Sequence, residues 1–385
     1  MQDFLKPINN TLEVQLEYLE PNSLGHQMAI YTNKLGFPDL QNVKIAILGV
    51  GENQTEDSIH PELSFDALRM SFYSLFPGNW SAAIADLGDI VAGHSRADTL
   101  FAVQKVVEEL LQQDIIPILL GGRQDLVYGQ YRGYTYLNKM LHYVNIDSQF
   151  DIGDMEAPIG NRNYVGKMVS TKPYRLFNYT VLGYQSYYNS ADEIALLDKL
   201  LFDAYRIGEI TSDVSKVEPY IRDADFVSLD ARSIQAAYMG SVHYNPNGLN
   251  SREVCALTRY AGLSNTCNSF SITEMYGLKN NPQAAMLLAQ CVWYFIEGVN
   301  FRVNDEDFED DNFYKNYQVP IDDMVLHFKK SLKSGRWWIK LPKSLDLDNK
   351  VKSVALLPCS YDDYVAACHQ EIPERWLKAQ KKVDF

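Results

Sequence analysis

The sequence has few cysteines, an excess of acidic over basic residues and no long apolar run. Its five cysteines show no C-x-x-C spacing, which argues against a zinc or disulfide framework and favours reduced thiols. The 35 Lys and Arg are outnumbered by 49 Asp and Glu, so the net charge of -14 argues against nucleic-acid binding. The longest apolar run, 284–296, contains Gln290 and is shorter than the roughly 20 residues that span a bilayer. The first residues show no basic region followed by an apolar stretch, so we expect a cytoplasmic protein without a secretory signal or membrane span.

The apolar residues that are present, 46% of the chain, alternate between two patterns. Short continuous apolar runs predict buried strands, and apolar residues at helical spacing follow most of them. This alternation predicts an α/β fold with three α/β/α layers, in which helices cover both faces of a mostly parallel sheet. No repeat or low-complexity linker divides the chain, so we expect a single domain over 1–385. The predicted strands are 44–51, 115–120, 142–146, 179–183, 226–229 and 269–273. The predicted helices are 65–75, 192–206, 251–261 and 281–297, together with a helix that Asp98 caps and whose apolar positions run from 100 to 111.

Two regions near the C-terminus do not follow this alternation. Residues 305–311 contain six acids in seven positions and predict a solvated surface loop. Residues 330–385 are rich in aromatic side chains and predict an extension packed on the main domain. An interface with a protein partner, or with further copies of the chain, is a second interpretation of both regions.

Three polar segments follow predicted strands and are the strongest functional signal. They are Gly-Gly-Arg-Gln-Asp at 121–125, Asp-Ser-Gln-Phe-Asp at 147–151 and Ser-Leu-Asp-Ala-Arg at 228–232. Because parallel strands end at the same edge of a sheet, these side chains should converge there. None of the segments contains histidine or cysteine, although imidazole is a usual ligand of catalytic transition metals.

With these segments in this order, the chain resembles the ureohydrolase family of arginase, agmatinase and formiminoglutamase, and most of all formiminoglutamase. Stretches at 87–90, 246–253 and 269–274 also match, so the resemblance covers about 40–300. It implies an arginase/deacetylase-like fold. It also implies two manganese ions, held by Gly-Gly-Asp-His, Asp-Ala-His-x-Asp and Ser-x-Asp-x-Asp motifs, that activate a bridging hydroxide.

The resemblance assigns six metal-ligand positions, and three of them carry a different residue here. Gln124 and Gln149 stand where the family has histidine, and Arg232 stands where it has aspartate. The retained ligands are Asp147, Asp151 and Asp230. Glu274 stands where the family uses a glutamate to hold the amidine end of the substrate. One metal site is therefore lost, because a guanidinium cannot ligate a cation. The other becomes an all-oxygen set of Gln124, Asp147, Asp151 and Asp230, which suits one Mg²⁺ or Ca²⁺.

Electrostatics indicates what replaces the metals. Two carboxylates about 4 Å apart repel by roughly 4 kcal/mol at an effective dielectric constant of 20, so the acidic cluster needs a cation or protons. We expect Arg232 to occupy the space of the lost metal and to pair with the carboxylates, with Arg123 either balancing charge or facing solvent. This predicts a catalytically inactive family member with no cofactor that binds a small cationic ligand or a protein partner. The alternative is a divergent metal-dependent C–N hydrolase acting on a linear amidine such as formiminoglutamate.

Overall fold

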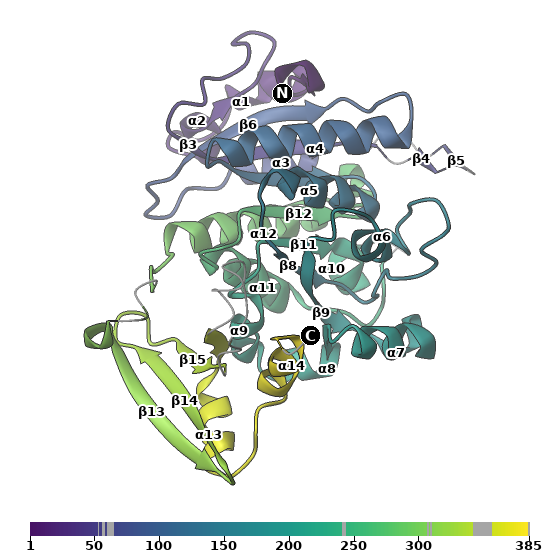
Figure 1. Cartoon of the computed structure of the whole chain (residues 1–385). Coiled ribbons are helices and arrows are strands. Elements are labelled where there is room, and N and C mark those ends of the chain that lie inside the picture. Colours follow the sequence, from purple (N-terminus) through teal and green to yellow (C-terminus); the bar gives the residue numbers. More distant parts are fainter. Residues whose placement is uncertain are drawn as a thin grey trace.

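A single mostly parallel sheet forms the centre of the molecule. The computed structural model describes residues 1–52, 54–55, 58–59, 65–240, 244–305, 308, 310–341 and 356–383. Within these residues the main sheet has ten strands in the order β1-β6-β3-β7-β12-β11-β8-β9-β10, with β2 beside β6 (Figure 1). Every pairing in it is parallel except that of β1 with β6. The strands are β1 Leu5–Lys6, β2 Ala29–Ile30, β3 Val43–Val50, β6 Ala83–Ile90, β7 Ile116–Gly121, β8 Leu141–Ile146, β9 Leu176–Tyr184, β10 Asp203–Arg206, β11 Phe226–Asp230 and β12 Ser269–Thr273.

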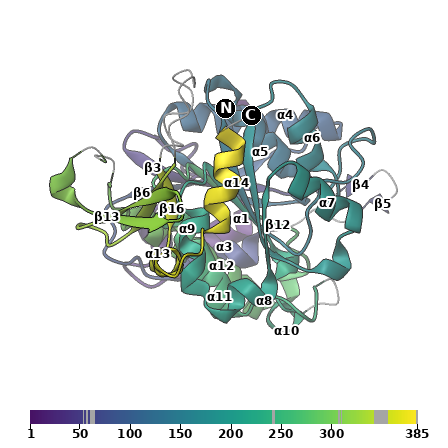
Figure 2. The same ribbon diagram turned by 60° about the horizontal axis from the view of Figure 1, so that its bottom comes forward.

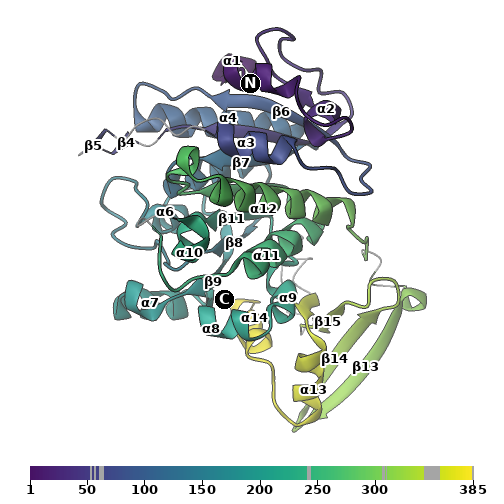
Figure 3. The same ribbon diagram turned by 180° about the vertical axis from the view of Figure 1, so that it is seen from behind.

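Helices cover both faces of this sheet, which confirms the predicted three-layer α/β/α fold (Figures 1 and 3). Strand β3 shows why, since Ile45 and Ile47 join the hydrophobic cluster under one set of helices and Ala46 and Leu48 join the cluster under the other. Helices α4 Arg96–Gln112, α5 Val127–Gly133 and α6 Tyr164–Ser170 lie on one face, and α3 Asp66–Tyr73, α10 Ala236–Met239, α11 Ser251–Leu263 and α12 Pro282–Asn300 lie on the other. The shorter elements are α1 Asn10–Leu16, α2 Leu24–Gln27, α7 Ala191–Lys199, α8 Ile207–Ser212, α9 Glu218–Ile221 and the hairpin strands β4 Gln54–Thr55 and β5 Ser58–Ile59.

Two predicted helices differ from the observed ones. The helix predicted over 192–206 is wrong in its second half, because α7 ends at Lys199 and the chain reverses at Leu201, whose φ is 57°. Strand β10 then pairs in parallel with β9. The prediction that Asp98 caps α4 is also wrong in detail: Ser95 is the N-cap, and Asp98 is the third helical residue, whose carboxylate accepts a 2.9 Å bond from the Ser95 backbone N–H.

The C-terminal extension folds as a small antiparallel sheet with two helices. Its strands follow the order β13 Tyr314–Ile321, β14 Met324–Ser331, β15 Trp337–Lys340 and β16 Leu356–Cys359, and its helices are α13 Tyr361–Cys368 and α14 Glu374–Val383. Trp337, Ile339 and Trp376 are buried together in a separate hydrophobic cluster. Figure 2 shows α14 lying across one end of the main sheet, so the extension closes that end.

The acidic segment is only partly described by the structure, since Glu306, Asp307 and Glu309 lie outside the described residues. Asp305 does not fit the predicted solvated loop, because it is buried and accepts a 2.7 Å hydrogen bond from Ser331 Oγ. Its carboxylate also lies 3.9 Å from Arg336 Nη1. Asp305 therefore anchors the segment to the extension. Among the described helices, none has the length and apolar character needed to cross a membrane.

Candidate functional site

Four polar side chains meet at the carboxyl edge of four neighbouring strands. Gln124 follows β7, Asp147 follows β8, Asp230 ends β11 and Glu274 follows β12. These strands are adjacent in the order β7-β12-β11-β8, which brings together residues that are far apart in the sequence. Each of the four residues is at most 1% exposed. Burial of polar groups at this depth requires that each of them be paired.

The backbone at this edge adopts unusual conformations. Asp151 and Glu274 have φ of 53° and 58°, a region that few residues other than glycine adopt and that is less common for Glu than for Asp. Gly122 has φ of 37°, and a side chain there would place its Cβ 2.6 Å from the carbonyl oxygen of Glu52. The Glu274 N–H donates a 2.9 Å bond to the Gly122 carbonyl, which fixes the two loops together. Backbone strain of this kind collects at functional sites.

The guanidinium of Arg232 lies at the centre of the cluster. Its Nη2 donates to Asp230 Oδ2 at 2.6 Å and to Gln124 Oε1 at 2.9 Å, and its Nε lies 2.9 Å from Asp230 Oδ2 and 3.6 Å from Glu274 Oε2. Burial alone would lower the pKa of Arg232, but Asp230 and Glu274 raise it well above the ordinary value. Arg232 is therefore a fixed positive charge among three of the predicted site residues.

Glu274 is saturated by partners from this chain. Its Oε1 accepts bonds from the Gln124 N–H at 2.8 Å and from Asn161 Nδ2 at 2.6 Å. Its Oε2 accepts from the Tyr276 hydroxyl and faces Arg232. A cationic ligand at Glu274 would have to displace these donors.

Asp147 is held by a polar layer that the sequence analysis missed. Its carboxylate accepts from Gln124 Nε2, from Asn145 Nδ2 at 3.0 Å and from the Gln149 N–H at 3.0 Å. Asn145 also donates to the Tyr164 hydroxyl at 3.2 Å. The signal for this layer was an asparagine inside the apolar run 142–146, where an unpaired amide would be costly.

Asp151 is the carboxyl group that lacks a donor. Neither of its oxygens has a hydrogen-bond partner among the described residues. Burial raises its pKa well above the ordinary value, and the neighbouring charge of Asp147 raises it further. Burial also raises the pKa of Asp230 to about 7, against the opposing effect of Arg232. Protons therefore balance part of the negative charge that Arg232 leaves uncompensated.

The remaining predicted residues lie beside this network. Arg123 is not solvent-facing: its side chain is 18% exposed and its Nε lies 3.6 Å from Asp125. Arg96 also pairs with Asp125 and lies 3.1 Å from Glu52, an arrangement that no sequence pattern indicated. The Gln149 side chain takes no part in the Arg232 network, and its Oε1 has no partner within the described parts of the chain.

The sequence profile of the arginase family matches residues 46–297, which include all of these site residues. The chain belongs to the arginase family. Formimidoylglutamase from Geobacillus thermodenitrificans is 30% identical over 193 residues, covering 46% of this chain and 58% of that protein. Formimidoylglutamase from Clostridium tetani is 23% identical over 194 residues, covering 45% and 56%. The chain thus spans about half the length of the curated relatives it matches.

Solved structures show the same fold at lower sequence identity. Formiminoglutamase from Trypanosoma cruzi with bound Mn²⁺ has a TM-score of 0.60 at 14% identity, covering 69% of this chain and 96% of that chain. Formimidoylglutamase from Bacillus subtilis has a TM-score of 0.61 at 17% identity, covering 70% and 91%. The predicted arginase fold is confirmed, and the family profile leaves the extension beyond residue 297 unmatched.

The residues of this arginase-family chain do not fit a pair of manganese ions. The guanidinium of Arg232 lies between Asp230 and Gln124, where oxygen ligands would have to converge on a cation. A guanidinium carries donors only and repels a metal ion. Within the described residues, no three His, Cys, Asp or Glu side chains are grouped so that they could hold an ion. A different chemistry therefore has to be considered for this site.

Proposed function

We propose that this chain is an arginase-family protein without two-metal hydrolase activity, retained as a binding or scaffolding protein. The observation that carries the proposal is the position of Arg232, whose guanidinium pairs with Asp230 and contacts Gln124 and Glu274. In this arrangement a tethered cation and raised carboxyl pKa values replace metal charge. An arginine supplies charge but does not generate hydroxide from water as a metal does.

The alternative is a divergent hydrolase that uses a single divalent ion, Mg²⁺ or Ca²⁺, and acts on a linear amidine. Two observations favour it over other enzyme classes. The curated relatives are formimidoylglutamases. In addition, both Asp151 oxygens lack donors among the described residues and lie near Asp147, so these two carboxylates could contact one ion if Gln124 moved.

A metal-content measurement on native and restored protein separates the two proposals. The native chain is purified without chelator, dialysed against Mn²⁺, and its metal content is measured by mass spectrometry. In parallel, a triple variant restores the family ligands as Gln124→His, Gln149→His and Arg232→Asp. We expect almost no manganese in the native chain and bound manganese in the triple variant, because the variant regains imidazole and carboxylate donors and loses the guanidinium.

The control is Arg259→Asp, which changes the net charge by the same amount as Arg232→Asp but lies on α11, away from the site. Arg259 is 36% exposed and pairs with Glu297. Its metal content should equal that of the native chain. Both native chain and triple variant are then assayed for formamide release from formiminoglutamate. Metal-dependent turnover by the native chain with no more than one bound ion would overturn the proposal and leave the single-ion hydrolase. Near two manganese ions per native chain would overturn both proposals and indicate a two-metal enzyme.

A further inference from the structure

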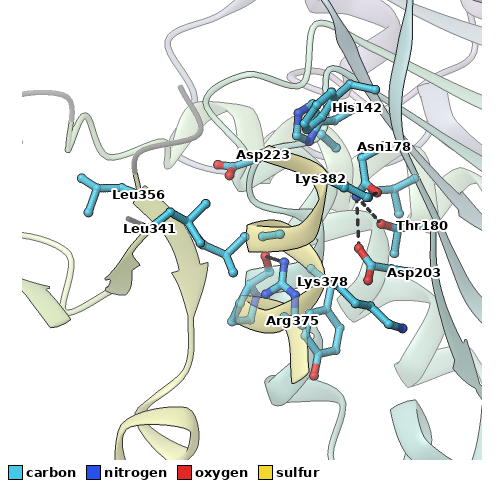
Figure 4. Close-up of a pocket in the computed structure, with 17 residues that line it drawn as sticks. His142, Asn178, Thr180, Asp203, Asp223, Leu341, Leu356, Arg375, Lys378 and Lys382 are labelled. Atoms are coloured by element: carbon cyan, nitrogen blue, oxygen red, sulfur yellow. Dashed lines mark hydrogen bonds between the residues drawn. The ribbon is translucent and has the colours of Figure 1, made fainter. Parts of the chain in front are cut away.

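A second site lies at the opposite end of the sheet, beneath α14. A cavity of about 60 Å³ separates α14 and β16 from the first residues of β8, β9 and β10 (Figure 4). Five residue-to-residue steps along β8, at about 3.3 Å each, lead from His142 at this end to Asp147 at the other. The lining includes Leu341, Arg375 and Lys382, which lie beyond the part of the chain that matches the arginase family. The cavity therefore exists only because the extension closes it.

The side of the cavity formed by the main domain carries two polar side chains without a hydrogen-bond partner among the described residues. The Asp223 carboxylate makes no hydrogen bond with any described residue, and burial raises its pKa to about 6. The ring of His142 packs against Phe177 with centroids 5.2 Å apart, and its nitrogens find no partner among the described residues. Burial lowers the pKa of His142, so the neutral ring offers one donor and one acceptor. Both residues are half-buried, and polar groups of this kind gain free energy when a ligand supplies the missing bonds.

The side of the cavity formed by α14 carries cations with donors to spare. Lys382 donates to Asn178 Oδ1, and burial lowers its pKa to about 8. Arg375 donates from Nη1 to the Pro358 carbonyl at 2.8 Å and stacks 4.6 Å from the Tyr220 ring centre. An ammonium has three donors and a guanidinium five, so both retain donors for an acceptor in the cavity. Figure 4 shows Lys382 and Arg375 on one helix, with Asp223 to the left of that helix, His142 above it and Asp203 beside Lys382.

We propose that this cavity binds a small zwitterion, with its ammonium at Asp223 and its carboxylate at Lys382 and Arg375. A simple anion would leave Asp223 unpaired. A simple cation would face Lys382 and Arg375, whose charges the lining residue Asp203 offsets only in part, because one carboxylate stands against two cations. A water-sized probe needs roughly 10–15 Å³, so the cavity holds about four to six non-hydrogen atoms. That is the size of glycine or alanine. The apolar part of the lining, such as Leu341 and Ala379, surrounds the short carbon skeleton.

Equilibrium dialysis of the full chain against radiolabelled glycine tests the proposal. We expect saturable binding of one glycine per chain with a dissociation constant between about micromolar and millimolar, as for other very small ligands. Unlabelled alanine should compete, whereas acetate and methylammonium at the same concentration should not, because each pairs with only one side of the cavity. Absence of saturable glycine binding, or equal competition by acetate or methylammonium, would overturn the proposal.

Two variants locate the bound glycine. Asp223→Asn removes the partner of the ammonium and should weaken binding at least about tenfold, the change expected for one lost charge-assisted bond. Ala379→Leu leaves every charge in place and fills the cavity from α14, so it should abolish binding. The control Asp192→Asn changes an exposed aspartate of α7 and should bind like the native chain. Circular dichroism verifies that all three variants fold, and unchanged binding by a folded Ala379→Leu protein would place the glycine elsewhere and refute the site.

Discussion

Replacing Arg232 by methionine would leave the carboxylates around it without the cation that contacts them. The side chain is 23% exposed, whereas its partner Asp230 is 1% exposed, so water cannot replace the lost contacts fully. Breaking a buried ion pair by removing one partner costs about 3–5 kcal/mol, because a charge is left without compensation. Methionine reproduces the unbranched arginine side chain as far as Nε and removes the rest of the guanidinium, so the effect of lost charge is larger than the effect of lost volume. We expect a loss of about 3–5 kcal/mol in the free energy of unfolding near neutral pH.

Urea denaturation followed by circular dichroism measures this loss, provided that the slope of the transition stays constant. Arg232→Lys keeps the charge but not the forked geometry, so its loss should lie between those of the native chain and the methionine variant. Arg259→Met is the matched control, because its 2.8 Å pair with Glu297 is more exposed and should contribute less than about 1 kcal/mol. If Arg232→Met costs no more than Arg259→Met, or stabilises the fold, then Arg232 does not replace metal charge and the reasoning is refuted.

Two further perturbations concern the extension and the end of the sheet that it closes. Burial raises the pKa of Asp223 from 3.8 to about 6, against the influence of Arg222 and Arg375. The folded chain therefore binds this proton more tightly than the unfolded chain. The stability that protonated Asp223 contributes is present below pH 3.8 and is lost as the pH rises through 6. Between pH 3.8 and pH 6 the free energy of unfolding of the native chain should therefore fall by about 1–3 kcal/mol relative to that of Asp223→Asn, as measured by urea denaturation across pH. A difference between the two proteins that stays constant with pH would contradict the raised pKa. Trp376 is 3% exposed and donates to the Lys340 carbonyl at 3.0 Å, so Trp376→Ala should cost about 3–5 kcal/mol in the unfolding of the extension. Limited proteolysis should detect this as faster cleavage within the extension, and the control Leu377→Ala, at a 38% exposed position, should be cleaved like the native chain.

The central sheet was predictable because its strands are buried on both faces. Such strands are continuous apolar runs, and β3, β7, β8, β11 and β12 each lie within about two residues of a predicted run. The parallel topology then brought Gln124, Asp147, Asp230 and Glu274 to one edge, as expected for α/β sheets. The chain reversal at Leu201 was not predictable, because leucine rarely adopts positive φ and carries no local signal for a turn.

The partners of the site residues were harder to predict than the residues themselves. Arg232 could be placed because its charge was needed near the carboxylates, whatever the details of the loop. Asn161 and Tyr276 hold Glu274 through contacts that depend on how two loops fold, and their residue types are common in loops without such a role. The four-stranded sheet of the extension was also missed. Its strands β15 and β16 have only four residues each, and the alternation of apolar and polar residues is interrupted by aromatic residues that pack between α13 and the sheet, such as Trp337 against Tyr364.

The two ends of the main sheet differ in how far the chain satisfies its own polar groups, and this difference decides where a ligand gains most. At the carboxyl edge, Glu274 and Asp147 each accept several bonds from neighbouring residues, whereas the Asp151 carboxyl group and Gln149 Oε1 lack partners among the described residues. A ligand at Glu274 or Asp147 must break these bonds before it forms new ones, so little net free energy remains for binding to these two carboxylates. At the amino end, the Asp223 carboxylate and the His142 ring lack partners among the described residues, and Lys382 keeps unused donors. A ligand there supplies missing bonds, so the cavity closed by the extension is a more favourable binding site than the Glu274 and Asp147 carboxylates.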